Sequence, residues 1–89
     1  MSNEIYLNHP TFGLLFSVCT IDENRELYTT LYAQRLFFLV TTGSEGLEFE
    51  PIGRNEARIV VENRLRILRR DRQMSGYDQL QNAYKRIFQ

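Results

Sequence analysis

Leu27-Tyr28-Thr29-Thr30-Leu31-Tyr32-Ala33-Gln34-Arg35-Leu36-Phe37-Phe38-Leu39-Val40 is the stretch of sequence that decides the fold. Its first six residues alternate between two sets of side chains, the period-two pattern of a strand with two different faces. After a short break at Ala33-Gln34, β-forming residues resume from Arg35 to Thr42. Two such runs joined by a tight reversal predict a pair of antiparallel strands.

The segments on either side of this pair extend the β pattern. Residues 12–21 are rich in aromatic and β-branched side chains and end at Asp22-Glu23-Asn24, a group with turn chemistry. Gly43-Ser44-Glu45-Gly46 is a second turn, and Pro51 ends the alternating run that follows it. The pattern of residues 12–52 therefore predicts three to five short strands in a small, strongly bent β-barrel.

Beyond Gly53 the apolar residues change to helical spacing. Asn55 is a suitable N-cap for a first helix, and Ser75 with Asp78 resembles the capping box of a second. Each predicted helix has one apolar stripe, formed by Ala57, Val60, Val61, Leu65 and Leu68 and by Tyr77, Leu80, Tyr84, Ile87 and Phe88. The sequence thus predicts an α+β protein, with a β domain over 1–53 and a two-helix hairpin over 54–89.

Length and composition narrow the possible functions. A chain of 89 residues buries one modest core, with little room for a deep catalytic cavity. No apolar run approaches the roughly 18 residues of a membrane-spanning helix, and the acidic, polar start at residues 1–4 does not fit a signal peptide. The single cysteine, Cys19, cannot form an internal disulfide, so we expect a cytoplasmic protein.

The sequence offers little support for catalysis. His9 is the only histidine and precedes Pro10, a setting more typical of a structural residue than of a general base. Cys19 lies in the middle of a predicted strand, where a free cysteine behaves as a small core residue. No phosphate-binding loop, spaced carboxylate pair or metal-ligand pattern is present in the sequence. We therefore expect a non-enzymatic protein without a cofactor or a metal.

Charge is divided between the two halves of the chain. Residues 1–53 contain seven acidic and two basic side chains, whereas residues 54–89 contain nine basic and four acidic ones. Five arginines fall within the nine residues 64–72, a pattern that suits contacts with phosphates. Direct nucleic-acid binding by this segment is therefore an alternative function, although a solvated face at a helix C-terminus explains the same pattern.

Interface-type residues are concentrated at the reversal between the two central strands. Tyr32 and Arg35, with Gln34 beside them, belong to the residue types that dominate protein interfaces. In the strand that follows, Leu36 and Phe38 share one face. Exposure of these two side chains beside Tyr32 would create an apolar patch with a polar rim. Alternatively, Tyr32 and Phe38 pack against the C-terminal helices and are buried. The sequence alone leaves both possibilities open.

Three blocks of sequence resemble a known family. Residues 6–15 (YLNHPTFGLL), 31–40 (LYAQRLFFLV) and 49–54 (FEPIGR) are similar to the PipX family, the cyanobacterial PII-interacting proteins X. The resemblance extends over essentially the whole chain, including Ala57-Arg58 and Leu65-Arg66. It implies a Tudor-like (KOW-like) β-barrel followed by two C-terminal α-helices.

The resemblance also implies two competing protein partners. One is the trimeric PII signalling protein, which would hold the chain through its T-loops when 2-oxoglutarate is scarce. The other is the dimeric transcription activator NtcA, which would take up the chain as a coactivator when 2-oxoglutarate is abundant. The family member would be a monomer when free and would make no direct DNA contact, although further regulators could be partners.

Both partners are expected to use the same face. The positions that carry this role over to the present sequence are Glu4, Tyr6, Thr11, Phe12, Gly13, Tyr32, Gln34, Arg35, Leu36 and Phe38.

Overall fold

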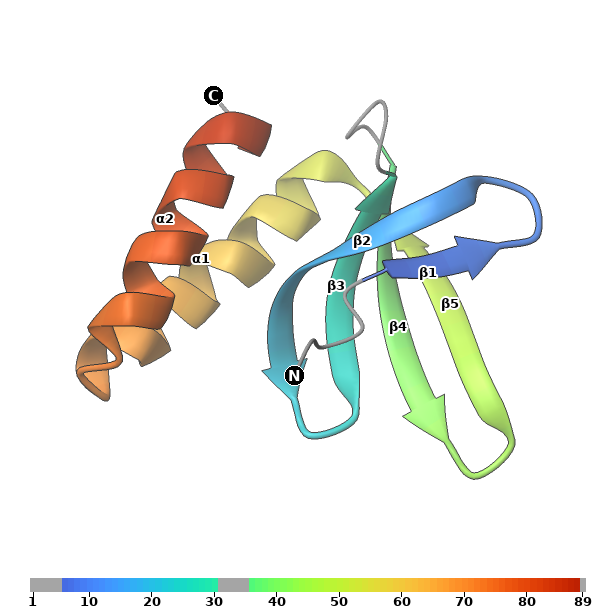
Figure 1. The fold of residues 1–89 in the computed structure, drawn as a ribbon, viewed down its shortest axis with the longest axis horizontal. Helices are drawn as coiled ribbons and strands as arrows, with labels where there is room; N and C mark the ends of the chain where they lie inside the picture. Colours follow the sequence, from blue (N-terminus) through green and yellow to red (C-terminus); the bar gives the residue numbers. More distant parts are fainter. Residues whose placement is uncertain (1–5, 31–35, 89) are drawn as a thin grey trace.

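A computed structural model describes residues 6–30 and 36–88 of the chain. Five strands precede two helices, in the order of the sequence (Figure 1). The strands are β1 (Tyr6–His9), β2 (Gly13–Asp22), β3 (Arg25–Thr30), β4 (Phe37–Gly43) and β5 (Gly46–Ile52). The helices are α1 (Arg54–Arg70) and α2 (Met74–Phe88). The predicted α+β class is confirmed.

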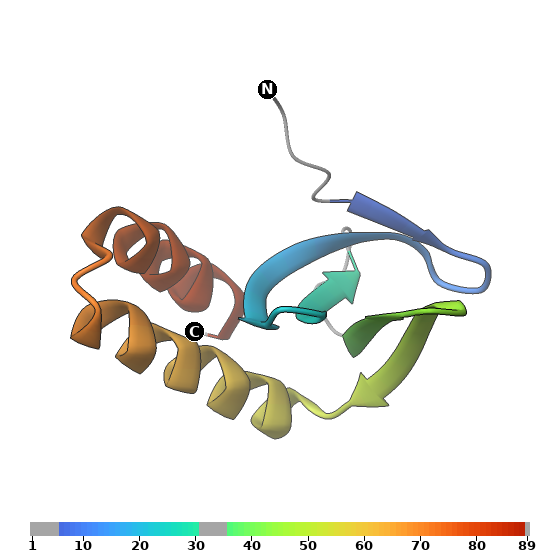
Figure 2. The same ribbon diagram turned by 90° about the horizontal axis from the view of Figure 1, so that it is seen from below.

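The five strands form one antiparallel sheet with the order β1-β2-β3-β4-β5. The sheet curls into a half-barrel, and both helices lie on its outer side (Figure 2). Two register shifts in β2, between Ser17 and Cys19 and between Thr20 and Asp22, mark β-bulges. Because a bulge increases local twist and bends its strand, these shifts allow β2 to follow the curve.

The strand register determines which side chains face the inside of the curl. Tyr28 lies opposite Phe38, and Val40 lies opposite Phe49, so the four side chains share one face of the sheet. Together with Leu15 and the partly buried Leu7, they form the inner apolar cluster. Leu27 and Phe37, one step along β3 and β4, face the helices instead.

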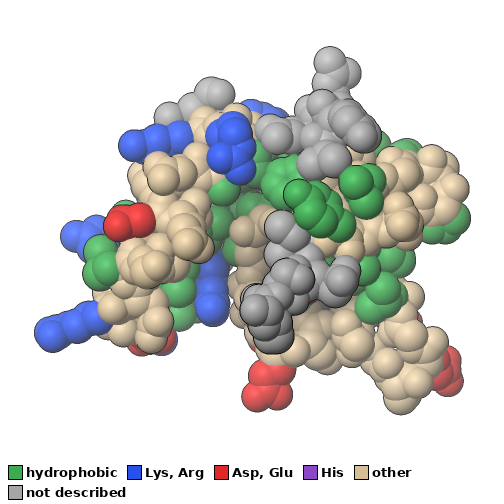
Figure 3. Space-filling model, in the orientation of Figure 1, with side chains coloured by type: hydrophobic (Ala, Val, Ile, Leu, Met, Phe, Trp, Pro, Cys, Tyr) green, Lys and Arg blue, Asp and Glu red, His purple; other side chains and the backbone are tan. Residues whose placement is uncertain are grey.

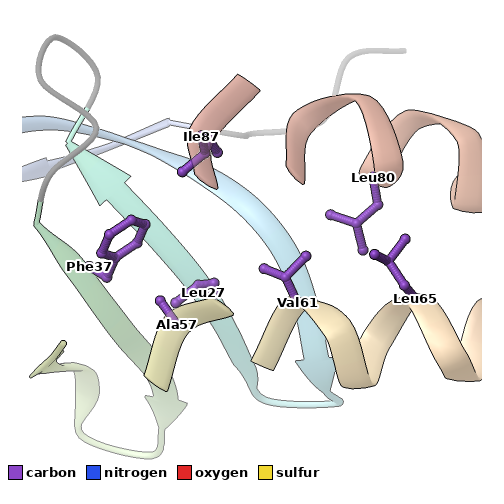
Figure 4. Close-up of a cluster of buried hydrophobic side chains, with 7 residues drawn as sticks. All are labelled: Leu27, Phe37, Ala57, Val61, Leu65, Leu80 and Ile87. Atoms are coloured by element: carbon purple, nitrogen blue, oxygen red, sulfur yellow. The ribbon is translucent and has the colours of Figure 1, made fainter. Parts of the chain in front are cut away.

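The outer face of the sheet and the two helices share a second cluster. It consists of Leu27, Phe37, Ala57, Val61, Leu65, Leu80 and Ile87, all at least nine-tenths buried (Figure 4). The apolar stripes predicted for both helices therefore face this core. Because strands and helices contribute to one core, the division into units 1–53 and 54–89 stays a prediction, although the last strand and the first helix do meet at Gly53.

Two contacts fasten α2 to α1 near the sheet. Arg54 Nη2 donates a hydrogen bond of 3.0 Å to the carbonyl oxygen of Ile87, and its guanidinium lies 5.3 Å from the centre of the Phe88 ring. Farther along the pair, the Tyr84 hydroxyl donates a 2.6 Å hydrogen bond to Glu62 Oε2. The C-terminal half of α2 is thus held by hydrogen bonds as well as by apolar packing.

The helix ends differ from the sequence-based predictions. Gly53, not Asn55, is the N-cap of α1, and it makes no side-chain hydrogen bond; α2 already includes Ser75 in its first turn. At the C-terminus of α1, the Gln73 N–H bonds to the Leu68 carbonyl while Arg72 adopts a φ of 60°. This is a Schellman motif with arginine at the left-handed position where glycine is usual.

Candidate functional site

The turn between β1 and β2 is organised by His9. Its Nδ1 atom accepts hydrogen bonds from the backbone N–H groups of Thr11, at 3.0 Å, and Phe12, at 3.2 Å. Gly13 follows with a φ of +78°, a left-handed conformation that glycine adopts without strain. Accepting at Nδ1 fixes the proton of neutral imidazole on Nε2. His9 is therefore the structural residue that the sequence suggested.

The same imidazole is part of an aromatic group that supports Phe12. The His9 ring stacks on Phe38 with a centroid distance of 5.4 Å, and Phe12 lies 5.0 Å from His9 and 5.5 Å from Phe38. Phe38 is 3% exposed, whereas Phe12 is 47% exposed. Phe12 is thus a solvent-facing aromatic side chain that packs on the half-buried ring of His9 and the buried ring of Phe38.

The start of β4 is fixed from the neighbouring strand. The Leu36 carbonyl oxygen accepts hydrogen bonds from Thr30 N, at 3.2 Å, and from Thr29 Oγ1, at 2.8 Å. These bonds hold the two ends of the β3–β4 connection side by side. The Leu36 side chain is 43% exposed, so it adds aliphatic surface at this end of the sheet.

Tyr6 occupies the outer edge of the sheet. It begins β1, pairs with Phe16 of β2 and is 46% exposed. Since strand residues advance about 3.3 Å each, Tyr6 and His9 are about 10 Å apart along β1. Tyr6 and the Thr11–Gly13 turn therefore mark opposite ends of β1 rather than a single point.

Six of the ten predicted site residues can be placed in detail. Thr11, Phe12 and Gly13 form one turn, with Phe38 beneath Phe12, while Tyr6 and Leu36 are exposed elsewhere on the sheet. We call the exposed residues Tyr6, Thr11, Phe12, Gly13 and Leu36 together the candidate face; Tyr6, whose neighbour Leu7 belongs to the inner cluster, lies on the opposite side of β1 from that cluster. The predicted site residues Glu4, Tyr32, Gln34 and Arg35 lie outside the described residues.

Neither of the two possibilities left open for Phe38 is correct. The side chain is buried, but within the concave face of the sheet rather than against the helices. Phe37 occupies the position beneath the helices, where it stacks on Phe88 with a centroid distance of 5.4 Å. Phe38 therefore supports the candidate face from below and does not contribute an exposed patch.

Two supporting residues were not among the predicted site residues. His9 positions Phe12, and Phe49 meets the His9 ring edge-on at a centroid distance of 5.0 Å. The sequence signal for His9 is its place three residues before Phe12, within reach of the turn's N–H groups. No local signal identifies Phe49, because its contact depends on the curl of the whole sheet.

The candidate face has side chains of the types that contact protein partners. Its described side chains are aromatic, aliphatic or hydroxyl, the types that supply contact area and polar rims at interfaces. Among the described residues, no cluster of three or more His, Cys, Asp or Glu side chains could hold a metal ion. Neither α1 nor α2 has the length and apolarity needed to cross a membrane.

Comparison with known proteins identifies the family of the chain. The family model described as "PipX: PII-interacting protein X" matches residues 3–88. No curated protein matches the sequence. The match covers both the strands and the helices, including every described residue of the candidate face. The chain therefore belongs to the PipX family of PII-interacting proteins.

Proposed function

We propose that the chain is a non-enzymatic, cytoplasmic adaptor that is exchanged between PII and the transcription activator NtcA. At low 2-oxoglutarate, PII trimers hold the chain through their T-loops. At high 2-oxoglutarate, PII releases it, and NtcA dimers loaded with 2-oxoglutarate bind it as a coactivator. Membership of the PII-interacting family supports the first partner; the exchange with NtcA rests on the resemblance of the three sequence blocks.

The single observation that carries this proposal is the exposed Phe12 ring, which packs on the rings of His9 and Phe38. An interface anchor is effective when it is rigid before binding, because little side-chain entropy is then lost on association. His9 and Phe38 hold the Phe12 ring in this way. The face can therefore serve two partners without changing shape itself.

Exclusive binding follows if both partners cover the candidate face. One surface cannot be occupied twice, so the chain goes to whichever partner binds it more tightly. The effector needs to act only on PII and NtcA, by changing their affinities for the chain. In this mechanism the free chain is a monomer and needs no cofactor.

Titration of the purified chain tests the exchange. Affinities for PII and for NtcA are measured with and without 2-oxoglutarate and ATP. We expect 2-oxoglutarate with ATP to weaken binding to PII and 2-oxoglutarate to strengthen binding to NtcA. Responses of the same sign would contradict the exchange even if both partners bind.

The Tyr32→Ala variant tests whether both partners use the same face, at a residue inside the block 31–40 that resembles the family. We expect this variant to lose binding to both partners while its circular dichroism and unfolding midpoint stay close to those of the parent chain. Ile59→Ala is a control, because Ile59 is an exposed apolar residue on α1, away from the candidate face. Tyr32→Ala binding with unchanged affinity would mean that the face is elsewhere.

The arginines of α1 favour nucleic-acid binding as a second candidate function, but less strongly. Arg66 donates a hydrogen bond to Asn63 Oδ1, and Arg70 pairs with Asp71 at 3.2 Å, so part of this charge is engaged within the helix. Salt-dependent binding of short DNA or RNA, lost in an Arg66→Gln/Arg69→Gln/Arg70→Gln variant, would support this function. No binding at low salt would exclude it.

A further inference from the structure

A groove of about 290 Å³ lies between β2 and the two helices. Val18, Cys19 and Thr20 form its strand side, and the helical side is formed by Arg64, Leu68, Gly76, Gln79 and Leu80. The space-filling view shows the hollow between the helical part and the sheet, with basic side chains on the helical side (Figure 3). The groove shares no residue with the candidate face.

The strand side of the groove is the part of β2 beyond its pairing with β1. β1 pairs with β2 only as far as Phe16, so from Ser17 to Asp22 β2 pairs with β3 alone among the described strands. Side chains of consecutive strand residues point to opposite faces. At this point of β2 the register shift between Ser17 and Cys19 interrupts the alternation, and Val18 and Cys19 both pack against the cluster that the sheet shares with the helices. Backbone N–H and C=O groups on an unpaired strand edge can pair with a further strand.

The helical side supplies a positive charge. Arg64 is partly buried and, within the described part of the chain, makes no hydrogen bond or ion pair. It also borders a second hollow of about 120 Å³, formed with Ile21 and Ile67 among others. A guanidinium that has lost part of its hydration is stabilised by a carboxylate, which it can bind with two parallel hydrogen bonds.

We propose that this groove binds an extended acidic segment of a partner protein. The segment's backbone adds to the open edge of β2, and an Asp or Glu side chain reaches the guanidinium of Arg64. Apolar side chains two positions from the acid, on the same face of the extended segment, contact Leu68 and Leu80. This combination of edge pairing and side-chain recognition is the mode in which sheets capture extended peptides.

Charge and shape favour a peptide over other occupants. The helical part, residues 54–89, has nine basic and four acidic side chains, so it attracts an acidic partner. A small carboxylate would engage Arg64 but would leave the edge of β2 unpaired. The peptide satisfies both features at once.

The test uses the full chain, labelled with ¹⁵N, and the probe peptide acetyl-Val-Thr-Glu-Thr-Val-amide in NMR titrations, so that the Glu and both Val side chains share one face. We expect shifts of the amides of Val18, Cys19, Thr20 and Gly76 during titration to about 5 mM peptide, the range that detects weak complexes. A matched peptide with Gln in place of Glu should bind about fivefold more weakly, since it lacks the charge.

Variants of α1 distinguish a specific contact of the peptide with Arg64 from non-specific attraction to the positive charge of the helix. Arg64→Met should weaken binding of the Glu peptide about fivefold and leave the affinity for the Gln peptide unchanged. Arg66→Met, at an exposed position two residues along, should leave both affinities unchanged. The peptide pair tests the charge contact on the parent chain, so the test stands even if Arg64→Met unfolds.

Several outcomes would overturn the proposal. They are the absence of shifts in the groove, equal binding of the Glu and Gln peptides, and shifts confined to Tyr6 and Phe12. Concentration-dependent shifts at Val18–Thr20 without peptide would instead assign the groove to a second copy of the chain. Shifts at these amides on deletion of residues 2–5 would assign it to the chain's own N-terminal residues.

Discussion

The imidazole of His9 meets the ring of Phe49 edge-on, with the ring centres 5.0 Å apart and the planes at 85°. His9 ends β1 and Phe49 lies in β5, the two strands at opposite ends of the sheet order. No backbone pairing joins these strands within the described sheet, so aromatic contacts connect them across the inner face. His9 therefore combines two roles, in the β1–β2 turn and in the curvature of the sheet.

Replacement of His9 tests this double role. His9→Ala removes the acceptor of two backbone hydrogen bonds and three aromatic contacts, so we expect the free energy of unfolding to fall by about 2 kcal/mol. Denaturant unfolding measures this change. Asn8→Ala, at the exposed neighbouring position, is the control and should change stability by less than about 0.5 kcal/mol.

Replacement of Phe12 tests its role in binding to PII. Phe12→Ala should weaken binding to PII by about tenfold or more, because a rigid exposed aromatic side chain is a typical hot spot. Leu47→Ala is a matched control, since Leu47 is 45% exposed but lies in the β4–β5 hairpin. Calorimetric titration gives both affinities. Equal losses for the two variants would show that Phe12 has no special role.

Tyr84 makes stability depend on pH in the alkaline range. Its hydrogen bond to Glu62 raises the pKa of Tyr84 above the ordinary value of 10.0. The unfolded chain then loses this proton at lower pH than the folded chain, so the stabilisation is fully present below pH 10 and declines as pH rises through the folded pKa. Melting temperatures between about pH 8 and 11 should fall more steeply for the parent chain than for Tyr84→Phe. Parallel curves would contradict this.

Cys19 should be slow to react. Burial raises the pKa of its thiol from 9.0 to about 12, although Arg64 opposes the rise. At pH 8 the reactive thiolate is then scarcer than in an unfolded chain, and alkylation by iodoacetamide should be slower by about a hundredfold or more. Mass spectrometry of the native and the guanidinium-unfolded chain measures the two rates. Similar rates would mean that the groove leaves the thiol accessible.

The left-handed conformation of Arg72 predicts a stabilising substitution. Arg72→Gly relieves the cost of a φ of 60° and should raise the free energy of unfolding by about 0.5–1 kcal/mol. Arg69→Gly, which removes the same side chain three residues earlier within α1, should lower it by about 1 kcal/mol. Thermal unfolding of the two variants gives the comparison, and shifts of the same sign would contradict it.

The sequence predicted the class of the fold because its periodicities are local. Alternation marked the central strands, and helical spacing marked the faces of α1 and α2 that meet the core. Helix starts were less predictable: Asn55 and Ser75 have good capping chemistry, but the chain enters α1 directly from β5 at Gly53. β1 was also missed, since its four residues show too short a pattern to identify a strand.

The surroundings of Phe37 and Phe38 could not be predicted from the sequence. Alternation correctly places these residues on opposite faces, yet both faces of this sheet are buried, one by the curl and one by the helices. Which face receives which ring depends on the handedness of the curl and on the side that the helices cover. These are properties of the assembled sheet, so a single strand's pattern does not contain them.

The paired hydrogen bonds on the Leu36 carbonyl have a consequence for evolution and design. Thr29 and Thr30 bind the Leu36 carbonyl from within β3, so both strands have hydrogen bonds at the very positions where the connection begins and ends. We therefore expect substitutions at positions 31–35 to change recognition more than the register of β3 against β4. A lineage could acquire new specificity there by gradual change, and a protein engineer could randomise the same positions as a compact library.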